Sequence, residues 1–516
     1  MFKINIVDSK LEKQIERKIF FIVVLISLFV SGARLSTSDE NAIYLLSERL
    51  TNFSLDVPNG IIDNGSFHNG KFYIWAEIGE AILILPFIVF AKFLNFIFPF
   101  SENFKILFSK GIVSTFNAFI GGLIAVFLYK LLRKFSVKLK VAIWIVFGLC
   151  FSTFLFPYFK TIIRDVQIAF FLLLAFYFLY EFKSSNVKKY LIFSGISVAF
   201  GFLVKMTFLL NVPFLSLYLF FISKKEKQEQ IKNLFYLLIP LFFSFMIFGT
   251  YNYLRFQNFF ETGYHGGTSF STPLYVGLYG LLFSSGKGMF VFAPLTILIF
   301  YSTKLFFEKY HSEAILIYTI IFSNLILYAK YIAWGGDGSW GPRYLISILP
   351  LFFIPIGVYL NENFISLKKI FLLLFALGIL IQIGGVSTYF GNYLRSIGEF
   401  PYTKKFDDKE FMQKSHFNPN YSPIVGHWKM FQENFVEHIN GNFPKFSNLK
   451  NPNARIPISQ DEEKKLLKTF DFWFMYAIYI GISSFIILIL LTIFILTILL
   501  LILNFHKMLH LIGDRN

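Results

Sequence analysis

The feature that most constrains this chain is a series of apolar runs that are long enough to cross a lipid bilayer. A membrane-spanning helix needs about 20 predominantly apolar residues, because hydrocarbon offers no partner to backbone polar groups. The pattern therefore predicts an all-α polytopic membrane protein with a bundle of about twelve transmembrane helices. The runs cover residues 18–33, 111–132, 141–158, 166–182, 190–208, 209–223, 232–251, 289–306, 313–333, 344–360, 370–390 and 472–504.

The composition agrees with this class, since 55% of the residues are hydrophobic and only 15% are charged. A soluble domain is usually less apolar. In a soluble protein, 48 Lys and Arg against 31 Asp and Glu would suggest nucleic-acid binding. Here many basic residues lie beside apolar runs, as membrane orientation requires, so no nucleic-acid partner is expected. The only cysteine, Cys150, lies inside an apolar run, which excludes an intramolecular disulfide.

The basic residues also predict the topology. If the N-terminus lies in the cytoplasm, the basic clusters all fall on the inner side. Loops on the inner and outer sides alternate consistently only if the apolar stretch Ala81–Phe98 does not span the membrane. This stretch contains Pro86 and Lys92, so we predict an interfacial or re-entrant helix on the outer side. The clusters are Lys130–Lys140, Lys183–Lys189, Lys224–Lys227, Lys304 with Lys309, Lys368 with Lys369, and Lys507 with Arg515.

Three regions follow from this reading. Residues 1–390 form a transmembrane module, in which residues 34–110 make a long outer loop. Residues 391–470 are hydrophilic and rich in Asn, Pro and Lys, so we expect a small extracytoplasmic domain or ordered loop there. Residues 471–516 would hold the last transmembrane helix and a cytoplasmic tail.

Acidic residues gather on the predicted outer side. Asp39 and Glu40 follow the first apolar run, where ionised groups cost little and can face a lipid-borne substrate. Alternatively, the two acids begin an interfacial helix, since acids favour helix N-termini. Asp165 stands at the start of a later run, where it could instead form a surface ion pair with Arg164.

Several carboxylates on one membrane face could act together. Converging carboxylates can activate a hydroxyl acceptor or hold a divalent cation through oxygen ligands. Asp39 and Asp165 are the candidate metal ligands. Glu77 and Glu80 precede the predicted interfacial helix and could complete the cluster, although interfacial helices commonly carry acids.

Three cations on the same side are candidate ligands for a lipid phosphate. Lys205 follows an apolar run, where the alternative role is to snorkel to the interface. Lys287 is flanked by glycines, which let backbone amides approach an anion, and Arg343 follows a Gly-Pro turn. A planar guanidinium beside a rigid turn can hold a phosphate in one orientation.

Two further residues accompany these cations. Tyr344 follows Arg343 in the stretch 334–344, which carries four glycines and two tryptophans. Tryptophans at an interface and glycines in a loop are ordinary, but their density beside Asp337 and Arg343 indicates a functional loop. His265 lies in the outer loop before Lys287 and could donate to a phosphate or sugar, or serve only as a loop residue.

Together these stretches resemble bacterial membrane glycosyltransferases of the GT-C superfamily, over residues 18 to about 360. The similarity is greatest to the branch of protein mannosyltransferases and lipid-A aminoarabinose transferases. The resemblance implies a GT-C-like bundle with an interfacial helix in the first outer loop. It rests on the first run with Asp39-Glu40 and Tyr44, Leu85-Pro86-Phe87, Arg164-Asp165, the Ser-Gly-Lys-Gly-Met-Phe stretch before Ala293-Pro294, and Trp-Gly-Gly…Gly-Pro-Arg-Tyr at 334–344.

The resemblance also implies an activity. The donor would be a polyprenyl-phosphate-linked sugar, and the acceptor a lipid, glycan or protein of the cell envelope. Transfer would be inverting, by an enzyme of the bacterial inner (cytoplasmic) membrane whose site faces the periplasm or the cell exterior. A divalent metal ion is compatible with this chemistry, and no organic cofactor is expected.

Residue roles follow from the same resemblance. Asp39 would be the catalytic base, with Glu40 as the second acid of the motif. Asp165 would position the acceptor or contact a metal, and Lys205 and Arg343 would bind the donor phosphate. The chain departs from the family pattern before the interfacial helix, where Glu77-Ile78-Gly79-Glu80 replaces a double proline.

Other functions share the same hydropathy. A transporter or flippase of a lipid-linked saccharide also needs many spans, but its charges should lie near mid-bilayer in broken helices. An O-antigen-ligase-like or polymerase-like enzyme would use a related lipid-phosphate leaving group.

Overall fold

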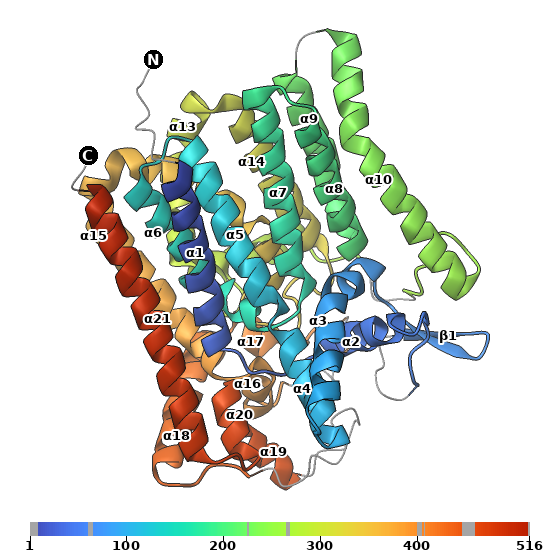
Figure 1. Cartoon of the computed structure of the whole chain (residues 1–516), viewed down its shortest axis with the longest axis vertical. Helices are drawn as coiled ribbons and strands as arrows, with labels where there is room; N and C mark the ends of the chain where they lie inside the picture. Colours follow the sequence, from blue (N-terminus) through green and yellow to red (C-terminus); the bar gives the residue numbers. More distant parts are fainter. Residues whose placement is uncertain are drawn as a thin grey trace.

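The computed structural model describes residues 9–59, 65–223, 226–264, 269–399, 405–406, 408–445 and 460–513. Long helices run side by side in one bundle, and shorter helices gather beyond one of its ends (Figure 1). Within the described part, seven helical segments are long and apolar enough to cross a membrane. The predicted class, a helical polytopic membrane protein, is confirmed. Several other predicted spans form shorter apolar helices, at 139–151, 189–204 and 206–222.

One layer of the bundle consists of helices that pack in sequence, each against the next (Figure 1). Gly195 lets α8 approach α10 closely, since a Cβ there would lie 2.3 Å from the carbonyl oxygen of Leu237. Apolar residues on facing sides thus bury one another. The helices are α1 (Ser9–Phe29), α5 (Phe116–Lys134), α7 (Arg164–Ser185), α8 (Lys189–Val204) and α10 (Lys227–Phe256).

The remaining bundle helices pack behind this layer. They are α6 (Leu139–Phe151), α9 (Val212–Ile222), α13 (Ile299–Lys309), α14 (His311–Lys330) and α15 (Leu349–Ser387). Short 3₁₀ segments lead between them: η1 (Phe156–Lys160), η2 (Met206–Asn211), η3 (Pro294–Leu298) and η4 (Arg343–Ile348).

Helix α15 contains most of the predicted spans 344–360 and 370–390, because it turns back on itself at Asn363 (φ −112°, ψ 16°). Near this turn, the Asn361 side chain accepts a 2.7 Å hydrogen bond from the amide of Lys138. At the far end, the Ser387 carbonyl accepts a hydrogen bond from Asp471. The two arms of α15 therefore cross the bundle in opposite directions.

The two ends of the bundle differ in character. At what we call the basic end, lysines and arginines pair with acids. At the opposite end, the site end, lie the start of α7, the end of α8 and the end of α15. The pairs of the basic end are Lys130–Glu16, Arg133–Glu12, Lys134–Glu181, Lys183–Glu313, Lys188–Glu229 and Lys309–Glu362.

We expect the two ends to face opposite sides of the membrane, with the basic end in the cytoplasm. In a Cys150→Ser background, single cysteines at Asp39 and Glu102 should react with an impermeant maleimide added outside. A cysteine at Lys138 should react only after the membrane is opened. Labelling of Asp39 and Lys138 from the same side would contradict this topology.

The loop predicted at 34–110 contains helices and a β-hairpin beside the site end (Figure 1). Helix α3 packs against α4, which continues into α5 after Thr115. Near the end of α3, Asn95 donates a 2.9 Å hydrogen bond to the side chain of Ser109 in α4. The elements are α2 (Ser38–Leu50), β1 (Gly65–His68), β2 (Lys71–Ile74), α3 (Ile78–Ile97) and α4 (Glu102–Ser114).

Helix α3 is apolar and long enough to span a membrane by length and composition alone. Its first turn abuts the end of α8, since a Cβ at Gly79 would lie 2.4 Å from Leu203. The helix exposes a row of large apolar side chains that includes Phe90, Phe93 and Phe96. We interpret α3 as the predicted interfacial helix, whose apolar side would lie in lipid.

Two boundary predictions were wrong. The stretch between the predicted spans 232–251 and 289–306, which should be an outer loop, contains an apolar helix, α11 (Leu274–Phe283), which packs on α14. The run 289–306 is not one helix, because α12 (Met289–Phe292) ends before Pro294 and α13 begins only after the 3₁₀ turn. Proline lacks the amide that would continue the hydrogen-bond ladder.

The C-terminal region is also helical where it is described. Residues 391–470 contribute most of α16 (Phe390–Ser396), α17 (Gln413–Phe417), the 3₁₀ turn η6 (Pro419–Tyr421), α18 (Pro423–Ile439) and α19 (Gln460–Leu467). The predicted span 472–504 is divided into α20 (Trp473–Tyr479) and α21 (Ser484–Gly513). Gly481, at φ +93°, takes the left-handed conformation that ends a helix. Helix α21 then packs on α1.

Candidate functional site

An ion cluster at the site end brings together three residues singled out from the sequence. Asp165, in the first turn of α7, is buried. Its Oδ1 accepts a 2.7 Å hydrogen bond from the Lys205 Nζ, and its Oδ2 lies 3.5 Å from the Arg343 Nε. One carboxylate therefore faces two cations, which leaves a net positive charge in the cluster.

Aromatic rings hold the two cations in place. Lys205 caps α8 in an extended conformation, which turns its side chain out of the helix. Its ammonium lies 5.2 Å from the ring centre of Tyr328 and 4.8 Å from that of Tyr344. These two rings stack with centroids 4.8 Å apart, and the Arg343 guanidinium also lies over Tyr344. Cation–π contacts thus position both cations.

A second network joins α3 to α7. Arg164 pairs with Glu77, whose other oxygen accepts a 3.2 Å hydrogen bond from the amide of Met206. Glu80 is buried and accepts a 3.2 Å hydrogen bond from the Gln167 side chain. The substrate-binding roles predicted for Glu77 and Glu80 remain predictions. In this geometry both acids fix the interfacial helix against the cluster.

Asp39 lies in the first turn of α2 and is exposed. Its charge acts on the guanidinium groups of Arg164 and Arg343, which places it within electrostatic range of the cluster. Burial raises the pKa of Asp337 to about 6, against the opposing effect of Arg343, and the charge of Asp39 adds to the rise. Asp39 is thus an accessible carboxylate beside a buried, positive site.

Glu40 is the anchor of the loop before α2. With Thr37 it forms a capping box, and its Oε2 also accepts a 2.9 Å hydrogen bond from the amide of Ser36. Its Oε1 accepts a 3.1 Å hydrogen bond from the amide of Ile162, near Asp165. Both oxygens are therefore engaged. Glu40 therefore anchors this loop, and the catalytic role predicted for it remains a prediction.

Lys287 lies beneath the loop at 334–343 and is fully buried. Its Nζ donates to the carbonyl oxygens of Asp337 and Ser339. Burial lowers the pKa of Lys287 to about 7. The structure therefore places Lys287 as a support for this loop, and substrate contact by Lys287 stays a prediction. His265 lies outside the described residues.

The surroundings of Asp165 do not fit a divalent cation. Both of its oxygens face cationic side chains, at 2.7 and 3.5 Å. Among the described residues, no three His, Cys, Asp or Glu side chains are grouped as metal ligands would be. We therefore derive no catalytic step through a metal at Asp39 and Asp165.

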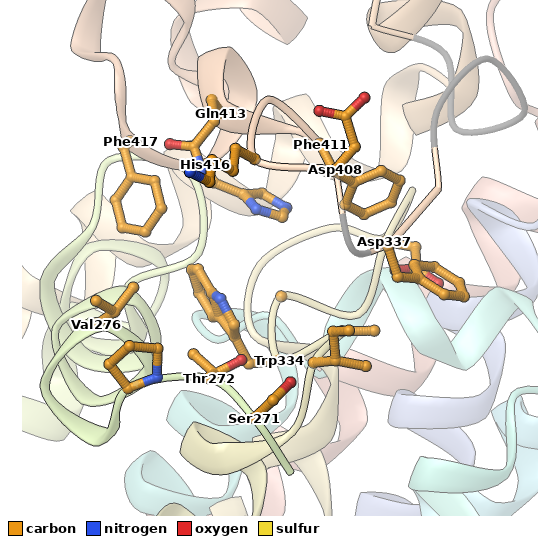
Figure 2. A pocket seen from close by; sticks show the side chains of 16 residues that line it. Ser271, Thr272, Val276, Trp334, Asp337, Asp408, Phe411, Gln413, His416 and Phe417 are labelled. Atoms are coloured by element: carbon orange, nitrogen blue, oxygen red, sulfur yellow. The ribbon is translucent and has the colours of Figure 1, made fainter. Parts of the chain in front are cut away.

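A cavity of about 490 Å³ lies beside the loop that carries Asp337 (Figure 2). Within the described part of the chain, neither Asp337 Oδ1 nor His416 Nε2 has a hydrogen-bond partner, although both atoms are buried. Burial also lowers the pKa of His416. The cavity is lined by Ser271, Thr272, Pro273, Val276, Ile332, Ala333, Trp334, Gly335, Asp337, Phe406, Asp408, Lys409, Phe411, Gln413, His416 and Phe417.

This cavity could not be predicted from the sequence. One wall comes from the predicted loop 334–344, but the other comes from residues 406–417, whose sequence has no clear periodicity. His416 lies against the ring of Trp334, with centroids 5.2 Å apart. The pairing of a conspicuous tryptophan with a distant histidine appears only in the folded chain.

Known proteins were compared with this chain. Residues 104–251 match the model of a family described as dolichyl-phosphate-mannose-protein mannosyltransferase. The matched region runs from α4 into α10 and contains Asp165 and Lys205. A comparison with curated proteins finds no match.

The chain also matches solved structures, of which two are described here. The Archaeoglobus fulgidus oligosaccharyltransferase in its apo form is 11% identical, with a TM-score of 0.48 over 88% of this chain; the chain spans 62% of that protein. ArnT from Cupriavidus metallidurans bound to undecaprenyl phosphate is also 11% identical, with a TM-score of 0.46 over 89% of this chain and 84% of that one. Over residues 104–251, the family match confirms the predicted resemblance to the GT-C membrane glycosyltransferases.

Proposed function

We propose that the protein is an inverting glycosyltransferase that moves a sugar from a polyprenyl-phosphate donor to an acceptor of the cell envelope. The observation that carries this proposal is the exposed carboxylate of Asp39 beside the buried Asp165–Lys205–Arg343 cluster. The family matched at residues 104–251 takes its name from dolichyl-phosphate-mannose, which is itself a polyprenyl-phosphate-linked sugar.

The reaction needs a base and a stabilised leaving group. The acceptor hydroxyl loses its proton to Asp39 as its oxygen attacks the anomeric carbon of the donor. The bond between that carbon and the phosphate oxygen breaks, and polyprenyl phosphate leaves. Attack from the side opposite the leaving phosphate inverts the anomeric centre. Lys205 and Arg343 stabilise the negative charge that grows on the phosphate.

Asp165 holds these two cations ready before the donor arrives. Preorganised charges stabilise a transition state better than groups that must first move. Donor phosphate would share Lys205 and Arg343 with Asp165, so the carboxylate sets their separation and orientation. In this scheme Asp165 touches the binding cations and needs no proton transfer of its own.

The cavity beside Asp337 offers room for a saccharide. Aromatic rings such as Trp334 and Phe411 can pack on the C–H faces of a sugar, and Asp337 and Gln413 can bond its hydroxyl groups. The loop that lines the cavity is close to Arg343, since a Cβ at Gly336, between the lining residues Gly335 and Asp337, would lie 3.2 Å from the Arg343 Cβ. We assign the cavity to a sugar ring of the acceptor.

The positions of the charges favour transfer over transport. A transporter or flippase would place its charges near mid-bilayer in broken helices. Here Asp165 and Arg343 begin α7 and η4, and Lys205 follows the end of α8. Mass spectrometry of envelope glycans from a deletion strain tests this proposal. We expect one sugar to be missing and its lipid-phosphate-linked form to accumulate, whereas unchanged glycans and lipids would reject it.

Donor binding by the two cations gives a sharper prediction. Arg343→Lys keeps the charge but loses the bidentate fork, and Lys205→Ala removes a charge. Each change should weaken the affinity for undecaprenyl phosphate by about 10-fold, as measured by titration of purified protein. Lys92→Ala, which alters an exposed cation of α3, should leave this affinity unchanged. Equal affinities in all three variants would rule out the assignment.

A further inference from the structure

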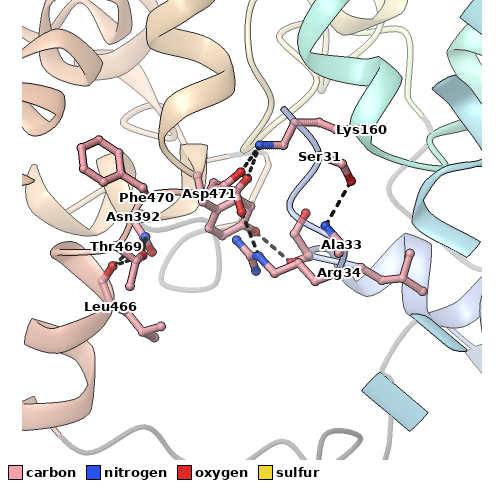
Figure 3. Close-up of polar contacts among 12 residues, drawn as sticks. Ser31, Ala33, Arg34, Lys160, Asn392, Leu466, Thr469, Phe470 and Asp471 are labelled. Carbon is pink, nitrogen blue, oxygen red and sulfur yellow. Dashed lines mark hydrogen bonds and ion pairs between the residues drawn. The ribbon is translucent and has the colours of Figure 1, made fainter. Parts of the chain in front are cut away.

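The loop between α1 and α2 (residues 30–37) leads directly to Asp39 and is held by a segment from the far end of the sequence. Asp471, just before α20, is the centre of this contact (Figure 3). Its Oδ1 accepts a 2.9 Å hydrogen bond from the Arg34 Nε, and its Oδ2 lies 2.8 Å from the Lys160 Nζ. The side chains of Asp471 and Lys160 are only 9% and 7% exposed.

The carboxylate is well suited to this role. Although burial opposes its ionisation, Arg34 and Lys160 hold the pKa of Asp471 well below its ordinary value. A half-buried cation, Arg34, and a buried one, Lys160, therefore pair with the same buried anion. Loss of that anion would leave both cations without their counter-charge, and unpaired buried charges are strongly unfavourable.

Further contacts, from Tyr389 and from the segment around Asp471, hold the α1–α2 loop. The amide of Trp473 donates to the carbonyl of Ser31 at 2.6 Å. The guanidinium of Arg34 lies between the rings of Tyr389 and Tyr476, 4.9 and 5.0 Å from their centres. Tyr389 in turn donates to the carbonyl of Ser36 at 3.0 Å. The loop is thus fixed at its beginning, middle and end.

Asp471 also reaches the second carboxylate of the candidate site. Lys160 ends η1, and the chain continues through Ile162 to Asp165. The amide of Ile162 donates to Glu40, next to Asp39. One carboxylate from the C-terminal segment therefore bonds to both stretches that carry the candidate acids.

We propose that Asp471 is a positioning residue, which sets the place of Asp39 relative to Asp165 and makes the segment 470–479 a part of the active site. The proposal rests on the proposed glycosyltransferase function. It assigns a role to a stretch that, in sequence, is only the beginning of an apolar run.

Two variants test this role by different means. Asp471→Asn removes the charge with little change of shape. Gly32→Ala keeps every charge, but its Cβ would lie 2.9 Å from Asp471 Oδ1 and would push the carboxylate away. Glu433→Gln, which changes a largely exposed acid of α18, is the control.

Three measurements are made on the full-length protein. Transfer is read from the sugar restored to a deletion strain, and donor-site integrity from the affinity for undecaprenyl phosphate. A spin label on a Ser38→Cys variant, in a Cys150→Ser background, reports the mobility of the residue next to Asp39. In Asp471→Asn and Gly32→Ala, transfer should fall by about 100-fold and the label should become mobile. The affinity should stay within about twofold of the unmodified protein.

Other results overturn the proposal. An immobile label in both variants shows that Asp471 does not hold the loop. A mobile label with normal transfer shows that the contact between Asp471 and the α1–α2 loop is not needed for the reaction. Loss of undecaprenyl phosphate affinity together with transfer shows a general collapse. Normal transfer by an Asp39→Asn variant would instead count against the proposed function. In that case the spin label would still show whether Asp471 holds the α1–α2 loop.

Discussion

Asp39→Asn should lower sugar transfer by about 10²- to 10⁴-fold, the usual cost of losing a general base. Asparagine has nearly the same shape but cannot accept the proton of the acceptor hydroxyl. Because Asp39 is exposed in the first turn of α2, its loss should cost at most about 1 kcal/mol through the helix dipole. Transfer by the purified variant, beside its thermal unfolding, measures both effects.

Glu40→Gln is the matched comparison for this experiment. Glutamine keeps an oxygen for the amide of Ser36 or Ile162 but loses the charge. We expect a milder loss of transfer than for Asp39→Asn, accompanied by a lower unfolding temperature, because Glu40 anchors the loop. Near-normal transfer by Asp39→Asn would reject Asp39 as the base and would leave Asp165 or Glu77 as the next candidate.

Asp165→Ala should have the largest effect on stability among the residues of the ion cluster. The Asp165 side chain is 2% exposed, and Lys205 and Arg343 both pair with it. Removing one partner of a buried ion pair typically costs about 3–5 kcal/mol, because the remaining charge stays buried. Thermal unfolding in detergent should therefore occur at a clearly lower temperature than for the unmodified protein.

A triple variant separates stability from donor binding. Asp165→Leu with Lys205→Met and Arg343→Met removes all three charges, and apolar replacement of a buried ion cluster is often neutral. We expect this variant to unfold near the temperature of the unmodified protein while its affinity for undecaprenyl phosphate is lost. If Asp165→Ala were as stable as Glu433→Gln, the ion cluster would not be a stabilising feature of the bundle.

Both the helical membrane class and the charged residues of the site end could be predicted from the sequence, and for the same reason. Apolar runs mark helices directly, and a charge such as Lys205 or Asp165 beside such a run must lie near a membrane surface. It could not show that these two residues touch. Their 2.7 Å contact depends on the packing of α7 against α8.

Some other features have a local signal in the sequence, and others have none. Thr37 and Glu40 form the Thr-x-x-Glu pattern of a capping box, which already points to an anchor for Glu40. Lys287 carried no such signal, because only the folded loop shows that its ammonium points toward backbone carbonyls. Asp471 only borders the predicted span 472–504 in the sequence, and its partner Arg34 is 437 residues away.

That separation has a consequence for the order in which the protein is made. Arg34 and Lys160 leave the ribosome long before Asp471, and at about 5–20 residues per second the wait is on the order of a minute. Until then both cations must remain hydrated or bound elsewhere. A nascent chain that stops before Asp471 therefore lacks the anion with which Arg34 and Lys160 pair in the folded protein. The contact that fixes the loop before Asp39 can therefore form only after residue 471 has been synthesised.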